Sequence, residues 1–104
     1  MPVKVEVTAE VVTALLSGEL DHHNAGAVRD AIDDAVQRNS ATLLILDFRD
    51  VTFMDSSGIG LVMGRYRQMR QQNGEVHVLN PSPQIGKVMK LAGLDRLVQL
   101  EVKK

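Results

Sequence analysis

Hydrophobic and polar residues alternate in the first part of the chain. The alternation runs over residues 3–7 and resumes over residues 12–16, with a short turn at Ala9 and Glu10 between them. A two-residue period is typical of a strand with one buried face. Because only a few residues separate the two stretches, they are predicted to pair as an antiparallel hairpin. We expect Gly18 to end the second strand.

From Asn24 onward the apolar residues follow the period of a helix. They recur three or four positions apart over residues 25–36 and give that stretch one apolar face. Asn24 can cap this helix by accepting a hydrogen bond from a free amide of its first turn. A second helix is predicted over residues 57–72, and Asn73 and Gly74 stop it.

Shorter segments complete the pattern. The continuous apolar run at residues 43–46 predicts a central strand covered on both faces. Residues 75–79 and 98–102 predict two further strands. Between them, Ser82 and Pro83 open a third helix, and Gly93 can cap its end.

The predicted order of elements is β-β-α-β-α-β-α-β, in a single domain over residues 1–104. A succession of strand, helix and strand implies parallel pairing through right-handed crossovers. The fold class is therefore α/β, with a mixed sheet in which the N-terminal hairpin is antiparallel and the later strands are parallel.

Charge and composition exclude several classes of function. The chain has 12 Lys and Arg residues against 13 Asp and Glu residues, for a net charge of -1, which disfavours nucleic acid and anionic lipid as direct partners. It has no cysteine, which excludes disulfides, thiolate nucleophiles and cysteine-bound zinc. The charged first residues do not form a signal peptide, and no apolar run is long enough to span a membrane. We therefore expect a cytoplasmic protein.

The most informative segment is residues 50–66, which leads from the central strand through a loop into the second long helix. In parallel α/β sheets functional residues gather at this kind of junction, where free amides and the helix dipole favour a phosphate. A simpler interpretation is that Asp55, Ser56 and Ser57 form a helix cap and that Gly58 permits a tight turn. Taken alone, the Asp-Ser-Ser-Gly motif favours the cap, and Ser57 is the better placed of the two serines to provide it.

The glycines of this segment also invite a nucleotide-binding interpretation. Gly58, Gly60 and Gly64 follow a strand and enter a helix, but their spacing is G-x-G-x-x-x-G, which differs from the dinucleotide-binding fingerprint. No Gly-Lys-Ser/Thr follows to make a P-loop. We therefore expect Gly60 and Gly64 to let the helix pack closely on the sheet.

Two motifs carry a family resemblance. The run FMDSSGIG at residues 53–60, followed by Gly64-Arg65-Tyr66, resembles the signature of bacterial anti-sigma-factor antagonists of the STAS family. The run GELDHH at residues 18–23 is similar to the sporulation branch of that family. The resemblance covers residues 5–100 and implies a single STAS domain. It places the phosphorylated serine of the family at Ser56, the first serine of the pair.

The resemblance implies a partner-switching function. The unphosphorylated chain would bind an anti-sigma factor that is also a serine protein kinase, so that the sigma factor is released. That kinase would phosphorylate Ser56 with its own ATP and release the chain, until a PP2C-type phosphatase restores it. The chain is thus expected to be no enzyme and to need no cofactor.

Three alternatives remain beside this interpretation. One is an antagonist of the general stress response, and another is a STAS-type sensor of a nucleotide or other ligand. The third, an enzyme, would need a base near Ser56, and no G-x-S-x-G motif is present.

The family pattern also suggests partner-binding residues. It places acidic contacts to a basic patch of the kinase at Glu19 and Asp21; equally, Asp21 could cap the first helix and Glu19 could be solvated. His22 and His23 beside Asp21 could suggest a metal site. Adjacent residues seldom converge on one ion, however, and no third ligand is suitably spaced, so we expect no metal.

The remaining expected contacts lie around Ser56. Asp55, Ser57 and Gly58 flank it, and we expect all three in the partner-binding surface. Leu61 lies one turn further along the helix, away from the apolar stripe. It is therefore also expected at the interface.

Overall fold

A tight turn at residues 9 and 10 folds the start of the chain back on itself. β1 (Val3–Thr8) and β2 (Val11–Leu20) pair antiparallel across this turn, in which Ala9 adopts a left-handed backbone with φ 54°. The computed structural model describes residues 2–102. The predicted hairpin is confirmed.

The later strands add to the hairpin in chain order. β2 pairs parallel with β3 (Leu43–Met54), β3 with β4 (Glu75–Leu79), and β4 with β5 (Gln99–Glu101). The described residues thus form one mixed sheet of order β1-β2-β3-β4-β5. This arrangement confirms the predicted fold class and order of elements.

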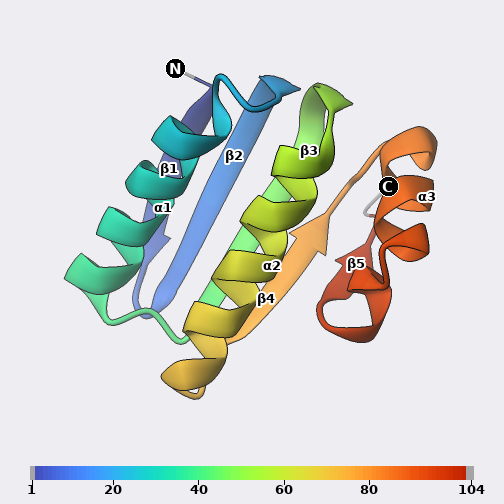
Figure 1. The fold of residues 1–104 in the computed structure, drawn as a ribbon. Helices are drawn as coiled ribbons and strands as arrows, with labels where there is room; N and C mark the ends of the chain where they lie inside the picture. Colours follow the sequence, from blue (N-terminus) through green and yellow to red (C-terminus); the bar gives the residue numbers. More distant parts are fainter. Residues whose placement is uncertain (1, 103–104) are drawn as a thin grey trace.

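Helices connect the parallel strands. α1 (Ala25–Asn39) joins β2 to β3, α2 (Ser56–Gln71) joins β3 to β4, and α3 (Pro83–Leu91) with a short 3₁₀ turn (Leu94–Arg96) joins β4 to β5. Figure 1 shows α1 and α2 side by side across one face of the sheet. Within residues 2–102 no helix is both long and apolar enough to cross a membrane.

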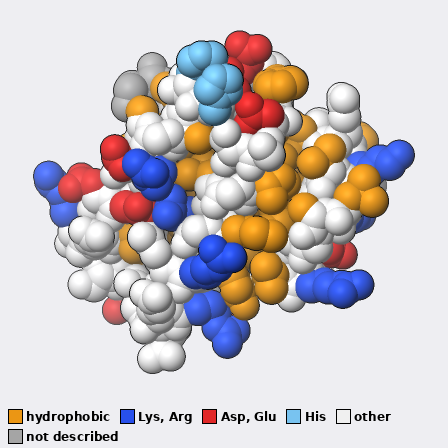
Figure 2. Space-filling model, viewed as in Figure 1, with side chains coloured by type: hydrophobic (Ala, Val, Ile, Leu, Met, Phe, Trp, Pro, Cys, Tyr) orange, Lys and Arg blue, Asp and Glu red, His pale blue; other side chains and the backbone are white. Residues whose placement is uncertain are grey.

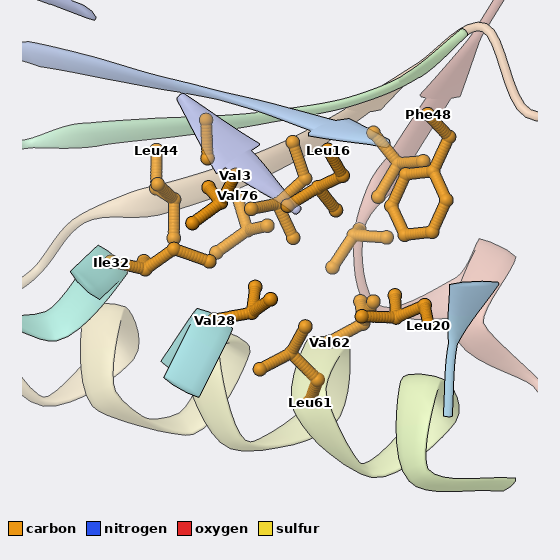
Figure 3. Close-up of a cluster of buried hydrophobic side chains, with 14 of the residues drawn as sticks. Val3, Leu16, Leu20, Val28, Ile32, Leu44, Phe48, Leu61, Val62 and Val76 are labelled. Carbon is orange, nitrogen blue, oxygen red and sulfur yellow. The ribbon is translucent and has the colours of Figure 1, made fainter. Parts of the chain in front are cut away.

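The core lies between the sheet and these helices. β3 contributes Leu44, Leu46 and Phe48, which are fully buried, and α1 faces them with Val28 and Ile32. Figure 3 shows side chains of this cluster converging from the strands and from the helices. Truncating one of these large side chains to alanine typically costs about 2–5 kcal/mol of stability.

Three details differ from the sequence prediction. Gly18 does not end β2, which continues to Leu20 through two irregularities in its pairing with β3; at Gly18 the backbone has φ 75°, which glycine adopts without strain. β3 is much longer than residues 43–46. β5 is shorter than predicted, since Val102 lies beyond its last residue.

The central strand is also not covered equally on its two faces. Successive side chains of a strand point to opposite faces, and Leu44 and Leu46 are buried whereas Leu43 and Ile45 are half-buried. The prediction of burial on both faces was therefore wrong.

Each of the parallel strands β3, β4 and β5 is added next to the strand before it, on the same side each time. Because such connections are right-handed, the connecting helices lie on one face of the sheet.

Candidate functional site

The loop between β3 and α2 is a single residue, Asp55. Its backbone is extended (φ -102°, ψ -168°), and its side chain caps α2 by accepting the Ser57 amide at 2.8 Å from Oδ1. The cap is thus Asp55, and not Ser57 as the sequence suggested. Because the helix starts directly after the cap, Ser56 is the first helical residue.

Ser56 is exposed at this position. Apart from the Asp55 cap, whose carboxylate meets the Ser57 amide, the start of α2 contains no acidic residue, and the positive end of the helix dipole lies there. A negative group attached to the Ser56 hydroxyl would therefore meet a favourable field from its own helix.

Gly58 has a packing role. It is buried, and a Cβ atom there would overlap the Met54 side chain and lie 3.3 Å from Cδ2 of Leu20. Gly60 and Gly64, by contrast, have no described atom within 4 Å of the position that a Cβ atom would take. The expectation that Gly60 and Gly64 pack on the sheet was wrong; the close approach occurs at Gly58.

Leu61 is another correction. Its side chain is only 5% exposed and belongs to the core. Since a buried side chain cannot contact a partner that docks on the unchanged surface, the structure does not support Leu61 as an interface residue. Gly58, in the first turn of α2, is likewise buried.

The loop after β2 lies beside this junction, because β2 and β3 are parallel neighbours and Leu20 is paired with Met54. The carboxylate of Asp21 accepts hydrogen bonds from the amides of His23 (3.0 Å) and Asn24 (3.2 Å). Asp21 therefore holds the turn that leads into α1, and Glu19 is exposed.

Asn24 precedes α1, but it does not cap the helix with its side chain. Its Nδ2 instead donates to the carbonyl of Glu19 at 2.8 Å. The predicted cap at Asn24 was thus right in position and wrong in its hydrogen bond. The side chain closes the loop after β2 rather than the first turn of the helix.

A contact between His22 and Asp55 joins the two motifs. His22 Nδ1 lies 3.7 Å from Asp55 Oδ2, and the rings of His22 and His23 are 4.0 Å apart. Figure 2 shows the histidines next to acidic side chains at one end of the molecule. The hydrogen bond from the Ser57 amide lowers the pKa of Asp55 below its ordinary value.

The chemistry of the site is that of an exposed hydroxyl beside acidic and imidazole groups. Within residues 2–102 no group of three or more His, Asp or Glu side chains could hold a metal ion. Sequence reasoning missed Phe53, whose side chain is 48% exposed only three residues before Ser56. Its place as the first residue of the FMDSSGIG run was the available signal in the sequence.

The fold and the site define a small α/β domain that presents a serine at the start of a helix. Residues 2–104 match the family model of the STAS domain, and the chain belongs to that family.

Two relatives and one solved protein show where in the family it falls. The chain is 43% identical over 88 residues to the anti-sigma F factor antagonist of Lysinibacillus sphaericus, covering 85% of this chain and 75% of that protein. It is 34% identical over 100 residues to the protein of the same name from Paenibacillus polymyxa, covering 96% and 86%.

The solved protein is the anti-sigma factor antagonist SpoIIAA. Its unphosphorylated form is 39% identical and superposes with a TM-score of 0.86, covering 98% of this chain and 88% of that chain. The phosphorylated form of SpoIIAA from Bacillus superposes with a TM-score of 0.79 at 39% identity, covering 98% and 91%.

Proposed function

We propose that this chain is an anti-sigma factor antagonist that phosphorylation of Ser56 switches off. It binds an anti-sigma factor and is itself no enzyme. The observation that carries the proposal is the place of Ser56, exposed as the first residue of α2. The existence of SpoIIAA in unphosphorylated and phosphorylated forms supports a switch by phosphorylation.

The physics of this position supports such a switch. A phosphate adds about -1.5 to -2 charges where a hydroxyl had been. At the start of α2 the helix tolerates this charge, so the fold of the free chain changes little. In a closed interface the same charge would be buried without a partner or would repel acidic neighbours. Phosphorylation therefore acts on binding and leaves folding intact.

The surface around Ser56 is suited to a protein partner. Phe53 is exposed, and Ile59 is half-buried one turn into α2. Figure 2 shows hydrophobic side chains at the surface between α2 and α3. Glu19, exposed at the end of β2, could pair with a basic group of the partner. Apolar contact near the serine and charge at the rim is the common composition of interfaces.

The proposed cycle has a phosphorylation step and a dephosphorylation step. The partner is an anti-sigma factor that is also a serine kinase, and it transfers phosphate from its ATP to Ser56. A PP2C-type phosphatase reverses this step in the cytoplasm. Both relatives are named antagonists of anti-sigma F, which favours a role in sporulation over the general stress response. The cycle needs no nucleotide bound by the chain itself, so it does not require a sensor role.

The switch predicts that Ser56→Asp folds normally and binds the kinase much more weakly. A carboxylate buried in an interface built for a hydroxyl should cost a few kcal/mol, and 1.4 kcal/mol corresponds to about a tenfold loss of affinity. We expect a loss of at least about a hundredfold, measured by calorimetric titration against the kinase with ADP. Thermal melts of the free variants separate binding from folding, and Ser56→Ala is the neutral control. Near-wild-type affinity of Ser56→Asp would place Ser56 outside the interface.

The assignment to the first serine is tested separately. Ser57→Ala should still be phosphorylated, because it keeps the hydrogen bond from the amide of residue 57 to the Asp55 carboxylate that caps α2. Ser56→Ala should abolish phosphorylation. Mass spectrometry after incubation with the cognate kinase and ATP locates the phosphate, and phosphate on Ser57 would contradict the proposal.

A further inference from the structure

A second feature lies on the other side of α2 from the apolar surface, where α2 faces α1. The two helices border an open cleft of about 310 Å³ near their first turns. It is lined by Ala25, Gly26, Arg29, Ser57, Gly60, Leu61 and Arg65. Its volume falls at the lower end of small-molecule sites, which measure about 300–1,000 Å³.

Arg65 is the unusual residue of this cleft. It is only 6% exposed, and its Nε lies 3.0 Å from Asp33 Oδ1. Its Nη1 is buried and has no hydrogen-bond partner among residues 2–102. Buried guanidinium groups are ordinarily paired on all sides, because an unmet donor costs free energy. Asp33 thus balances the charge of this cation at one edge, while the Nη1 donor has no hydrogen-bond partner among residues 2–102.

Arg29 adds a second cation to the same cleft. Its own partner is Asp30, at 3.2 Å from Nη2, and that carboxylate is 75% exposed, so the pair is screened by water and weak. Figure 2 shows basic side chains among acidic ones over this part of α1. The nearness of Arg29 contributes, after burial, to a lowered pKa of Arg65. An anion between the two guanidinium groups would relieve this repulsion.

The helices add to the attraction. Ala25 and Gly26 begin α1 and Ser57 lies in the first turn of α2, so two positive helix ends meet at the cleft. The first turn of α1 contains no acidic residue, whereas the Asp55 carboxylate caps the start of α2. Gly60 leaves open space where a side chain would project, with no described atom within 4 Å of a Cβ position. The cleft thus offers backbone dipoles, a hydroxyl and two guanidinium groups to one small ligand.

We propose that this cleft binds the phosphate group of a small phosphate ester through Arg65 and Arg29. Guanidinium groups form paired, charge-assisted hydrogen bonds with phosphate oxygens. A phosphate has enough oxygens to meet both arginines and the Ser57 hydroxyl together, whereas a carboxylate has two. The cleft does not require phosphorylation of Ser56, since the unphosphorylated chain contains all its groups.

Titration of the ¹⁵N-labelled chain with inorganic phosphate, at constant ionic strength and followed by NMR, tests the proposal. The amides of Gly26, Ser57 and Gly60 should shift and saturate. Arg29→Gln should weaken binding at least about tenfold, while Arg38→Gln should not, because Arg38 is an exposed arginine of the same helix outside the cleft. No kinase is present, so the result does not depend on the proposed switch.

A second pair of variants tests the space in the cleft instead of its charge. Gly60→Leu should fold, since the position is open, and should abolish the saturating shifts by filling the cleft. Gly64→Leu is the matched control, because Gly64 is equally open on the same helix but does not line the cleft. Equal shifts in all variants would overturn the proposal. An acetate titration as strong as the phosphate titration would overturn the assignment to a phosphate group.

Discussion

Asp55 shows how one side chain can organise the switch. Its carboxylate caps α2 through the Ser57 amide, and its second oxygen lies near His22 in the loop after β2. The residue therefore fixes the start of the helix directly before Ser56. It also connects the two motifs on which the family resemblance rests.

The cap makes stability depend on pH in a definite direction. The Ser57 amide lowers the pKa of Asp55 in the folded chain from its ordinary value of 3.8. The unfolded chain therefore takes up this proton first, and the stabilisation is complete above the ordinary pKa and lost as the pH falls through the folded value. Asp55→Asn should remove this part of the acid dependence, while Asp34→Asn on the exposed face of α1 should not. Denaturant unfolding over a series of pH values measures both, and identical pH profiles for wild type and Asp55→Asn would contradict the role of the cap.

At the scale of the element, the glycines of α2 differ in their surroundings. Gly58 lies where the helix crosses Met54 and Leu20, and the missing side chain is what lets β3 turn directly into α2. Gly60 faces open space in the cleft with α1. A glycine inside a helix costs stability relative to alanine, so Gly60 weakens α2 without a packing gain.

This contrast predicts opposite effects of one methyl group. Gly58→Ala should lower the free energy of unfolding by about 1–3 kcal/mol, because the added carbon overpacks the junction. Gly60→Ala should raise it by up to about 1 kcal/mol, through helix propensity alone. Denaturant unfolding of the two variants under the same conditions decides this. A stability loss in Gly60→Ala equal to that in Gly58→Ala would show that Gly60 is also packed.

At the scale of the whole molecule, an ion pair joins the two helices that cover the sheet. Arg65 of α2 and Asp33 of α1 lie on the facing sides of the helices, and Asp33 is 20% exposed. In contrast, Arg38 and Asp34 form an exposed pair one turn apart on α1. Buried and exposed pairs in the same molecule allow a direct comparison.

Breaking the buried pair should be costly. Asp33→Asn leaves the Arg65 charge without a counter-ion and should lower the free energy of unfolding by up to about 3 kcal/mol. The double variant Asp33→Leu with Arg65→Met should recover most of this loss, because it removes both charges. Asp34→Asn, the exposed control, should change stability by less than about 0.5 kcal/mol. Chemical denaturation of all three provides the measurement, and a loss in Asp33→Asn no larger than in Asp34→Asn would show that the buried pair is not stabilising.

The periodic pattern of the chain determined a large part of this structure. The hairpin, the three helices and the order of strands follow from local patterns, because alternation and helical spacing each report one buried face. Ser82 and Gly93 mark the ends of α3 as predicted: the Ser82 hydroxyl accepts the Ile85 amide at 3.2 Å, and Gly93 has φ 82°. The motif around Ser56 was likewise readable, since it is a continuous run of residues.

Tertiary structure decided what depends on partners far away in the sequence. Leu61 and Arg65 look like surface positions of a helix, but α1 packs over them and buries both. Gly58, not Gly60, lies against the sheet side of α2, where Met54 and Leu20 leave no room for a side chain. The length of β3 and the partial exposure of Leu43 and Ile45 depend on which face of the sheet the crossover helices cover. Local periodicity shows that a helix or strand has an apolar face. Only the packed fold determines which neighbouring element covers that face.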